Sequence, residues 1–362
     1  MKIENIDNRS DYKLFSGISK MVYQDMPFYR DTEKSIEELL IKKTSGFHNH
    51  ALVKSFVIRD GNDYVGRFAL IRDDQLPDYV QVSFFEALPG LGNIYIEIKS
   101  LIKKIWTDCK KVIVGLNGHL NYGAGFLLNR FDEAPLFGLP YTPPYYPEYF
   151  KDLTEVRMFT FRQSMSEYFQ WADSNKIKKT MDGLIVRQIN KHDLKKESAI
   201  YTDLNNKCFV NHPYWASRDE KEDLELFNPF RFLLKNENLV FAEYQGKPVG
   251  FYLWYPDFNQ LVNSQRDLNV MDVIRYKLNS RIDTFRFTEI GILPEFQRSP
   301  VGMALLSAVN PYLRKEGFKY CEGGFIFEKN RASVLFATRL MQRSSSLVTD
   351  PYRRFAVYED EL

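Results

Sequence analysis

The residues from Phe287 to Leu306 combine a strand-type run, a short loop and a helix-type run. The strand pattern ends at Ile292, residues 297–300 form the loop, and an apolar helical pattern begins at Val301. Amide N–H groups in the first turn of a helix lack partners within the helix, and the helix dipole favours negative charge there. This order can therefore bind a pyrophosphate without many basic side chains. An ordinary strand–loop–helix connection is the alternative interpretation.

This segment resembles motif A of GNAT acetyltransferases, in which a Gln or Arg begins a loop with glycines at its fourth and sixth positions. Gln297 matches the first position and Gly302 the sixth, whereas Pro300 stands at the fourth. Proline has no N–H, so we expect one phosphate donor fewer than usual. The resemblance implies that acetyl-CoA or another acyl-CoA is the co-substrate. It implies binding by Ile290, Ile292, Gln297, Arg298, Ser299, Val301, Gly302, Met303 and Asn330.

Two further segments resemble the same superfamily. Residues 246–251 look like its G-x-x-V-G-F strand, and residues 328–332 resemble the strand-to-helix crossing of motif B. In that motif an Asn, here Asn330, commonly faces the pantetheine arm. The tyrosine that usually serves as general acid lies seven residues later, where this chain has Ala337. A proton donor would therefore have to come from elsewhere.

The resemblance implies direct attack of an amine on the thioester. The amine must be neutral, so a carboxylate or a water chain has to remove a proton. Glu289, at the edge of the strand, is our candidate base, and Asp257 is a second candidate. A backbone amide near Ile292 would bind the developing oxyanion. Tyr358 is the candidate proton donor. The alternatives are an exposed strand carboxylate, a turn-stabilising aspartate and a packed core tyrosine, respectively.

Histidine and cysteine spacing predicts no metal site and no disulfide framework. His48 and His50 would share a face on a strand, but no further ligand pattern accompanies them. His212 lies in a loop that GNAT enzymes often use near the acceptor, where it could contact substrate or simply order the loop. The three cysteines are widely separated, which fits a reducing compartment.

The order hairpin, strand, helix, strand occurs twice along the chain. We therefore predict a mixed α/β fold of two tandem GNAT-like domains, each with a mostly antiparallel central sheet flanked by helices. We expect a degenerate domain over residues 1–165, a linker over 166–182 and an acyltransferase domain over 183–362. In the first half, residues 89–93 supply glycines without a preceding Gln or Arg. We expect no coenzyme A there, and a role for this half in shaping the acceptor site or a homodimer.

Nearly the whole chain also resembles a bacterial group of tandem GNAT-like proteins that has no established substrate. The segments that carry this resemblance are residues 84–86, 125–128, 131–135, 141–146, 256–260, 328–332 and 357–359.

Charge and hydropathy exclude several classes of partner. The net charge is +2, from 49 basic and 47 acidic side chains, so we expect neither nucleic acid nor a membrane as partner. This balance also disfavours an aminoacyl-tRNA-dependent transferase on the same tandem fold, which would need a basic groove. The polar start at Met1–Asn5 and the lack of a long apolar run predict a cytoplasmic protein.

Together these features predict an acyl-CoA-dependent N-acyltransferase that acts on a small-molecule amine. The alternative is a non-catalytic GNAT-like module that binds or regulates, which Pro300 and Ala337 favour.

Overall fold

The computed structural model describes the chain except for residues 7–10, 32–33, 175–180, 263–267, 279–280 and 345–349. Residues 175–180 of the expected linker therefore lie outside the described residues. The first half contains β1 (Lys2–Asn5), α1 (Tyr12–Val22), α2 (Lys34–Ile41), β2 (Ala51–Asp60), β3 (Asp63–Asp73), β4 (Tyr79–Ala87), α3 (Ile94–Ile105), β5 (Lys111–Val114), β6 (Phe126–Leu127), α4 (Tyr146–Tyr149) and β7 (Thr154–Ser164).

The second half contains α5 (Met165–Ser174), β8 (Leu184–Gln188), α6 (Leu194–Phe209), α7 (Glu220–Phe227), β9 (Leu239–Tyr244), β10 (Lys247–Pro256), α8 (Val270–Leu278), β11 (Thr284–Ile292), α9 (Val301–Glu316), β12 (Tyr320–Phe327), α10 (Arg331–Ser344) and β13 (Arg354–Glu361).

The two predicted hairpins, β2–β3 and β9–β10, are present. Both turn through a glycine with positive φ, +58° at Gly61 and +75° at Gly246, which a residue with a side chain adopts less readily. The apolar pattern predicts helices around residues 194–209 and over residues 94–109. Helix α6 spans the first range, whereas α3 ends at Ile105. The sequence pattern did not predict α7, α8 or the short α4.

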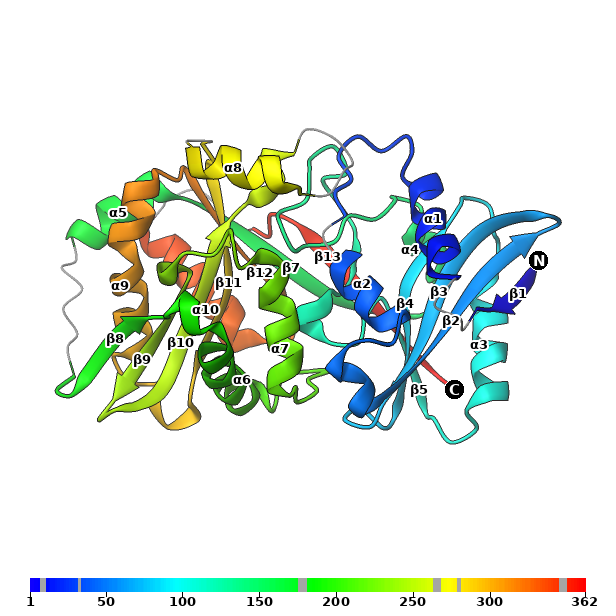
Figure 1. Cartoon of the computed structure of the whole chain (residues 1–362), viewed down its shortest axis with the longest axis horizontal. Coiled ribbons are helices and arrows are strands. Elements are labelled where there is room, and N and C mark those ends of the chain that lie inside the picture. The colour runs from blue at the N-terminus through cyan, green and yellow to red at the C-terminus, as the bar shows by residue number, and fades with distance from the viewer. Residues whose placement is uncertain (7–10, 32–33, 175–180, 263–267, 279–280, 345–349) are drawn as a thin grey trace.

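The thirteen strands of the described residues belong to one sheet rather than two. Twelve follow the order β1-β2-β3-β4-β5-β13-β7-β12-β11-β10-β9-β8, and β6 pairs with β13. Among these described strands, β4–β5 and β11–β12 are the parallel pairs, and the other pairs are antiparallel. The two halves exchange strands: β13, from the second half, lies between β5 and β7, while β7, from the first half, pairs with β12 (Figure 1). We expected a sheet in each half, and this exchange joins them.

A buried ion pair ties the exchanged strands together. Arg353, directly before β13, donates from Nη1 to both carboxylate oxygens of Glu322 on β12, at 2.9 Å each. Thr160 on β7 donates its hydroxyl to the same carboxylate at 2.8 Å. The Arg353 and Glu322 side chains are 6% and 2% exposed, so neither charge is satisfied by water. The three neighbouring strands are thus cross-linked by one network.

Helices cover both faces of the sheet in the second half. On one face, Phe251 and Leu253 of β10 pack with Tyr201 and Leu204 of α6. On the other, Tyr252 and Trp254 share a core with Val301, Leu305 and Val309 of α9. The alternation along β10 thus divides this half into an α6 side and an α9 side.

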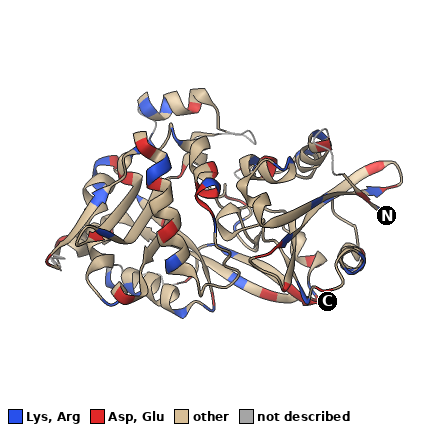
Figure 2. Ribbon diagram, turned by 60° about the horizontal axis from the view of Figure 1, so that its bottom comes forward, with Lys and Arg blue, Asp and Glu red and all other residues tan. Residues whose placement is uncertain are grey.

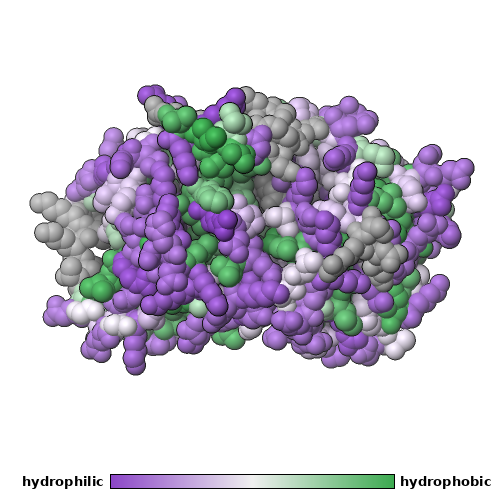
Figure 3. Space-filling model, in the orientation of Figure 1, coloured by the Kyte–Doolittle hydropathy of each residue, from purple (hydrophilic) through white to green (hydrophobic). Residues whose placement is uncertain are grey.

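On the surface, Figure 2 shows basic and acidic residues interspersed over both halves. Figure 3 shows hydrophobic surface over α8, whose exposed apolar side chains are Val270, Met271, Ile274 and Leu278. Among the described residues, no helix has the length and apolar character needed to cross a bilayer.

The buried pair generates a stability prediction. Replacing Glu322→Gln leaves the buried Arg353 guanidinium with the Glu133 carboxylate alone, 3.3 Å from Nη2 and 33% exposed, so the free energy of unfolding should fall by about 3 kcal/mol. The control is Glu155→Gln on β7, because Glu155 pairs with Arg157 where the two side chains are 34% and 56% exposed. That change should cost less than about 1 kcal/mol. Urea unfolding measures both values, and equal losses would contradict the importance of the buried pair.

Candidate functional site

The candidate site opens where the parallel strands β11 and β12 separate. They pair only from Thr284–Phe287 with Tyr320–Gly323, although β11 continues to Ile292 and β12 to Phe327. A cavity of about 980 Å³ occupies this opening and extends along both faces of the sheet. Beyond Phe287 and Gly323, the facing edges of β11 and β12 do not pair with each other. Their backbone N–H and C=O groups are therefore available to a ligand.

A β-bulge sets which side chains of β11 face α6. The register between β10 and β11 shifts between Leu253 and Trp254, which pair with Glu289 and Phe287, so Thr288 is the extra residue. Glu289 lies opposite Leu253 and therefore on the α6 side. The bulge thereby places the carboxylate at the opening rather than against the α9 core.

Several predicted site residues line this cavity, and several do not. Those that line it are Glu289, Ile290, Ile292, Gln297 and Asn330, together with Ala337. Arg298, Ser299, Val301, Gly302 and Met303 lie in the turn and first helical turn beyond it.

The turn that precedes α9 is held by hydrogen bonds between its own residues. A short 3-10 helix, Pro294–Phe296, precedes Gln297, and Pro300 occupies the N-cap position of α9. The Ser299 hydroxyl donates to the Phe296 carbonyl at 2.6 Å and accepts from the Val301 amide at 3.3 Å. A Cβ on Gly302 would lie 3.1 Å from Cδ1 of Ile292, so this position lets helix and strand approach closely.

Glu289 is held by two side chains of α6. Its Oε2 accepts from the Tyr201 hydroxyl at 2.5 Å and from Nδ2 of Asn205 at 2.8 Å. Burial raises the pKa of the Glu289 carboxyl, while nearby Arg218 and these two hydrogen bonds act in the opposite direction. A carboxylate with a raised pKa, facing a cavity, has the properties of a general base.

A buried arginine connects Glu289 to the first half of the chain. Arg218 donates from Nη2 to Oδ1 of Asn205 at 2.9 Å and pairs with Asp223 at 2.9 Å, where both side chains are almost fully buried. Its Nη1 lies 2.8 Å from Nδ1 of His119, a residue of the first half. Burial lowers the pKa of His119 well below its usual value, and the nearby Arg218 charge lowers it further. The ring is therefore neutral beside the guanidinium.

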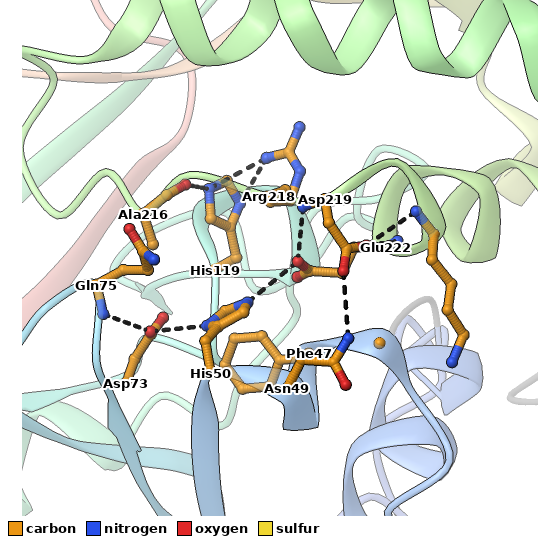
Figure 4. A network of polar contacts seen from close by, with 12 residues as sticks. Phe47, Asn49, His50, Asp73, Gln75, His119, Ala216, Arg218, Asp219 and Glu222 are labelled. Atoms are coloured by element: carbon orange, nitrogen blue, oxygen red, sulfur yellow. Dashed lines mark hydrogen bonds and ion pairs between the residues drawn. The ribbon is translucent and has the colours of Figure 1, made fainter.

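A second histidine of the first half, His50, also contacts the second half of the chain. His50 lies between Asp73, 2.9 Å from Nδ1, and Glu222, 3.1 Å from Nε2 (Figure 4). Hydrogen bonds to these two carboxylates raise the pKa of His50 to about 10, so the ring is charged at neutral pH. Tyr122 donates to the other oxygen of Glu222 at 2.5 Å. The two halves therefore meet through a charged, hydrogen-bonded interface.

His48 and His50 do not share a strand face, in contrast to the arrangement we considered. His48 lies in a 3-10 helix, Gly46–Asn49, and His50 caps it, because the chain turns there before β2 begins. Among the described residues, no group of three or more His, Cys, Asp and Glu side chains could hold a metal ion.

The remaining candidates lie in different places. His212 lines the cavity, with Nδ1 3.1 Å from the Pro213 carbonyl. Asp257 lies outside the lining and accepts from the Phe137 amide at 2.8 Å, and burial raises its pKa to about 6. Tyr358 is 2% exposed within β13, packed against Phe126 and Phe150 in the core of the first half. The structure does not bring Tyr358 to the cavity.

The corresponding opening of the first half is closed. Beyond the paired part of β4 and β5, the Ser83 hydroxyl donates to the Leu116 carbonyl and Asn117 Oδ1 accepts from the Phe84 amide at 2.8 Å. These contacts keep the segments that follow β4 and β5 linked. At the corresponding point of the second half, β11 and β12 separate. The first half instead contributes to the wall of the cavity through residues 120–123, 137–138, 161 and 163.

Sequence reasoning missed Tyr201, Asn205 and Arg218, which surround Glu289. Tyr201 and Asn205 are four positions apart on α6, a spacing that places them on one helix face, but many such pairs are structural. Arg218 precedes the capping residue Asp219 of α7, and nothing in its local sequence indicates contact with a distant histidine.

Comparison with known proteins gives distant relatives over almost the full length. No protein-family model matches the chain. Protein YghO of Escherichia coli is 20% identical and is aligned over 98% of this chain and 94% of its own length. A protein named bacterial ceramide synthase, from Caulobacter vibrioides, is 18% identical over 90% of this chain and 88% of its own.

Solved structures resemble the whole chain. A tandem GNAT protein from the clavulanic acid biosynthesis pathway superposes with a TM-score of 0.56 at 12% identity, covering 99% of this chain and 98% of that one. A GCN5-related N-acetyltransferase from Anabaena variabilis gives 0.54 at 8% identity, covering 99% and 72%. The chain therefore has the fold of the tandem GNAT proteins.

Proposed function

We propose that the protein is an acyl-CoA-dependent N-acyltransferase whose reaction takes place at the opening between β11 and β12. The observation that carries the proposal is the position of Glu289, a hydrogen-bonded carboxylate with a raised pKa, at the edge of that opening. The tandem GNAT fold is in accord with acyl transfer. The name of the relative from Caulobacter vibrioides is in accord with it too, since a ceramide is an N-acylated amine.

The separated strands fit the narrow pantetheine arm of an acyl-CoA. Gln297 and Asn330 line the opening from its two sides, and Asn330 Oδ1 also accepts from the Ser333 amide at 3.2 Å, which fixes its side chain. The start of α9, with Gly302 close to β11, would receive the pyrophosphate through helix amides and the helix dipole. Pro300 supplies no donor, so Arg298 and the amides that follow Pro300 would carry this contact.

In the reaction, a neutral amine attacks the thioester carbonyl and forms a C–N bond. Glu289 removes a proton from the amine, and Tyr201 and Asn205 orient the carboxylate through their hydrogen bonds. A strand amide near Ile292 would stabilise the tetrahedral oxyanion. The C–S bond then breaks, the thiolate takes up a proton from water, and Glu289 releases to water the proton that it accepted. The products are an amide and free coenzyme A.

Calorimetric titration with acetyl-CoA tests the donor site. A Gly302→Trp substitution would fill the space between α9 and Ile292 and should abolish measurable heat of binding. The control is Gly17→Trp in α1, where a Cβ would have no neighbour within 4 Å. Binding that survives in the Gly302 variant would move the donor site elsewhere. A wild-type protein that binds neither acetyl-CoA nor a longer acyl-CoA would favour the non-catalytic module.

The pH dependence of acyl transfer tests Glu289. Burial raises its pKa, so kcat/KM should rise with pH through an apparent pKa above the usual carboxyl range. Glu289→Gln should remove this limb and lower kcat by about 10²–10⁴-fold. A raised pKa in the folded protein means that the ionised Glu289 carboxylate lowers the free energy of unfolding at pH values above that pKa. The neutral glutamine side chain of the variant avoids this cost, so the variant should melt no lower than the wild type at pH 8. An unchanged pH profile in the variant would exclude Glu289 as the base.

A substitution of Tyr201 tests how the base is positioned. The Tyr201 hydroxyl donates to the Glu289 carboxylate and favours its charged form. Tyr201→Phe should therefore shift the acidic limb of the rate profile to higher pH by about one unit, with little change in KM for acyl-CoA. Tyr168→Phe, which removes a hydroxyl bonded to Asn310 on the α9 side, should leave the limb in place. A pure loss of stability in Tyr201→Phe, without a shifted limb, would contradict the assignment.

A further inference from the structure

Two neighbouring groups of apolar side chains line the cavity, Tyr255 packs against both, and the first begins beside the candidate base. Tyr201, which donates to Glu289, packs edge-on against Phe227 with ring centroids 5.3 Å apart. Farther along, Phe137 contacts Phe230 at 5.0 Å and Phe258 at 5.2 Å. We call the cavity-lining side chains of the two groups the apolar wall: Phe209, Phe227 and Leu253 in the first group, and Phe137, Phe230 and Phe258 in the second.

The charges around the cavity do not suit an acceptor with many amines. The charged residues that line it, among those described, are Lys207, Arg286, Glu289, Lys329 and Arg331. Only one of these is a carboxylate. A polycationic acceptor would lose its hydration on entry and would need several carboxylates in return. The lining therefore matches a ligand with a single amine, placed at Glu289.

The cavity is also larger than an acetyl group and a small amine require. Its volume of about 980 Å³ lies near the upper end of the roughly 300–1,000 Å³ found for sites of drug-sized ligands. Much of its surface is aromatic or aliphatic, and contact with such a surface is favourable for hydrocarbon. An aliphatic chain attached to the acceptor amine would fill the space along the apolar wall.

Three buried polar atoms on residues that line the cavity lack a hydrogen-bond partner within the described residues. They are Nε of Arg286, Nε1 of Trp215 and the hydroxyl of Thr288. Arg286 is 8% exposed, and its other nitrogens donate to the Phe137 and Gly324 carbonyls and to the Tyr255 hydroxyl. An unsatisfied buried donor is costly, so these groups indicate a ligand that supplies oxygen acceptors.

We propose that the acceptor is a long-chain amino alcohol: its amine meets Glu289, its oxygens meet Thr288, Trp215 and Arg286, and its alkyl chain lies along the apolar wall. This inference rests on the proposed N-acyl transfer and adds the substrate class. The step is the one given above: the C–N bond of an amide forms, the C–S bond of the thioester breaks, and the hydroxyl groups are unchanged.

A chain-length series tests the substrate class. Acceptors share a 2-amino-1,3-diol head and carry no chain, a chain of intermediate length or a chain of about eighteen carbons, all in the same non-ionic detergent. Each buried methylene contributes a factor of about four, so kcat/KM with acetyl- or palmitoyl-CoA should rise at least about 100-fold across the series. Amide product by mass spectrometry and free thiol release measure the rate. Equal rates for the chainless and longest acceptors would overturn the substrate class and leave acyl transfer intact.

Binding without acyl-CoA separates this inference from the proposed function. The melting temperature should rise with chain length even if no acyl donor binds, because the apolar wall belongs to the protein alone. Lack of acyl transfer together with such a rise would reject the proposed chemistry and keep the amphipathic ligand. Lack of any rise, with short hydrophilic amines acylated, would reject the amphipathic ligand alone.

A valine substitution tests the oxygen contacts. Thr288→Val keeps the side-chain shape and removes a buried hydroxyl without a partner, so the free protein should melt at the same or a higher temperature. Its preference for the long-chain diol over an alkylamine of equal length should fall about 3–10-fold, the value of one hydrogen bond. Thr284→Val is the control, since this hydroxyl of the same strand donates to Asp283 and lies outside the lining. An unchanged preference in Thr288→Val would overturn the hydroxyl contact.

Discussion

The interrupted pairing of β11 and β12 is the constraint on which the site depends. Two parallel strands that share a ladder only as far as Phe287 and Gly323 leave a wedge in an otherwise continuous sheet. The wedge is kept open because β10 anchors β11 on one side and β7 anchors β12 on the other. The first half shows the contrasting case, in which Ser83 and Asn117 bridge the strands. A difference of a few side chains thus separates an open cleft in the second half from a closed core in the first.

The buried charge of Arg218 sets the second condition. A guanidinium removed from water needs anionic and hydrogen-bonding partners, and it finds them in Asp223, Asn205 and His119. Because Asn205 also donates to Glu289, the first half of the chain fixes the surroundings of a carboxylate in the second. The first half therefore helps to hold the surroundings of Glu289, although its own opening is closed.

Much of the fold could be predicted from sequence, because hydrophobic periodicity and turn glycines act locally. Both hairpins, α6 and the strand–turn–helix at Val301 follow from such patterns. Glu289 could be singled out by its place on a strand before that turn. Its partners could not, since the bulge at Thr288 and the contact of Arg218 with His119 depend on packing between segments far apart in the chain. The exchange of β7 and β13 also leaves no local signal, as both read as ordinary strands.

That exchange has a consequence for how the molecule is made. The strand that completes the first half's sheet, β13, leaves the ribosome after all the other strands and helices of the described residues, although its neighbour β5 was synthesised much earlier. Until then, one edge of β5 remains without its partner strand, and an open edge can pair with other chains. Synthesis order and assembly order are therefore opposed in this chain. A nascent chain stalled before β13 had emerged would carry its exposed edge in the half that had appeared first.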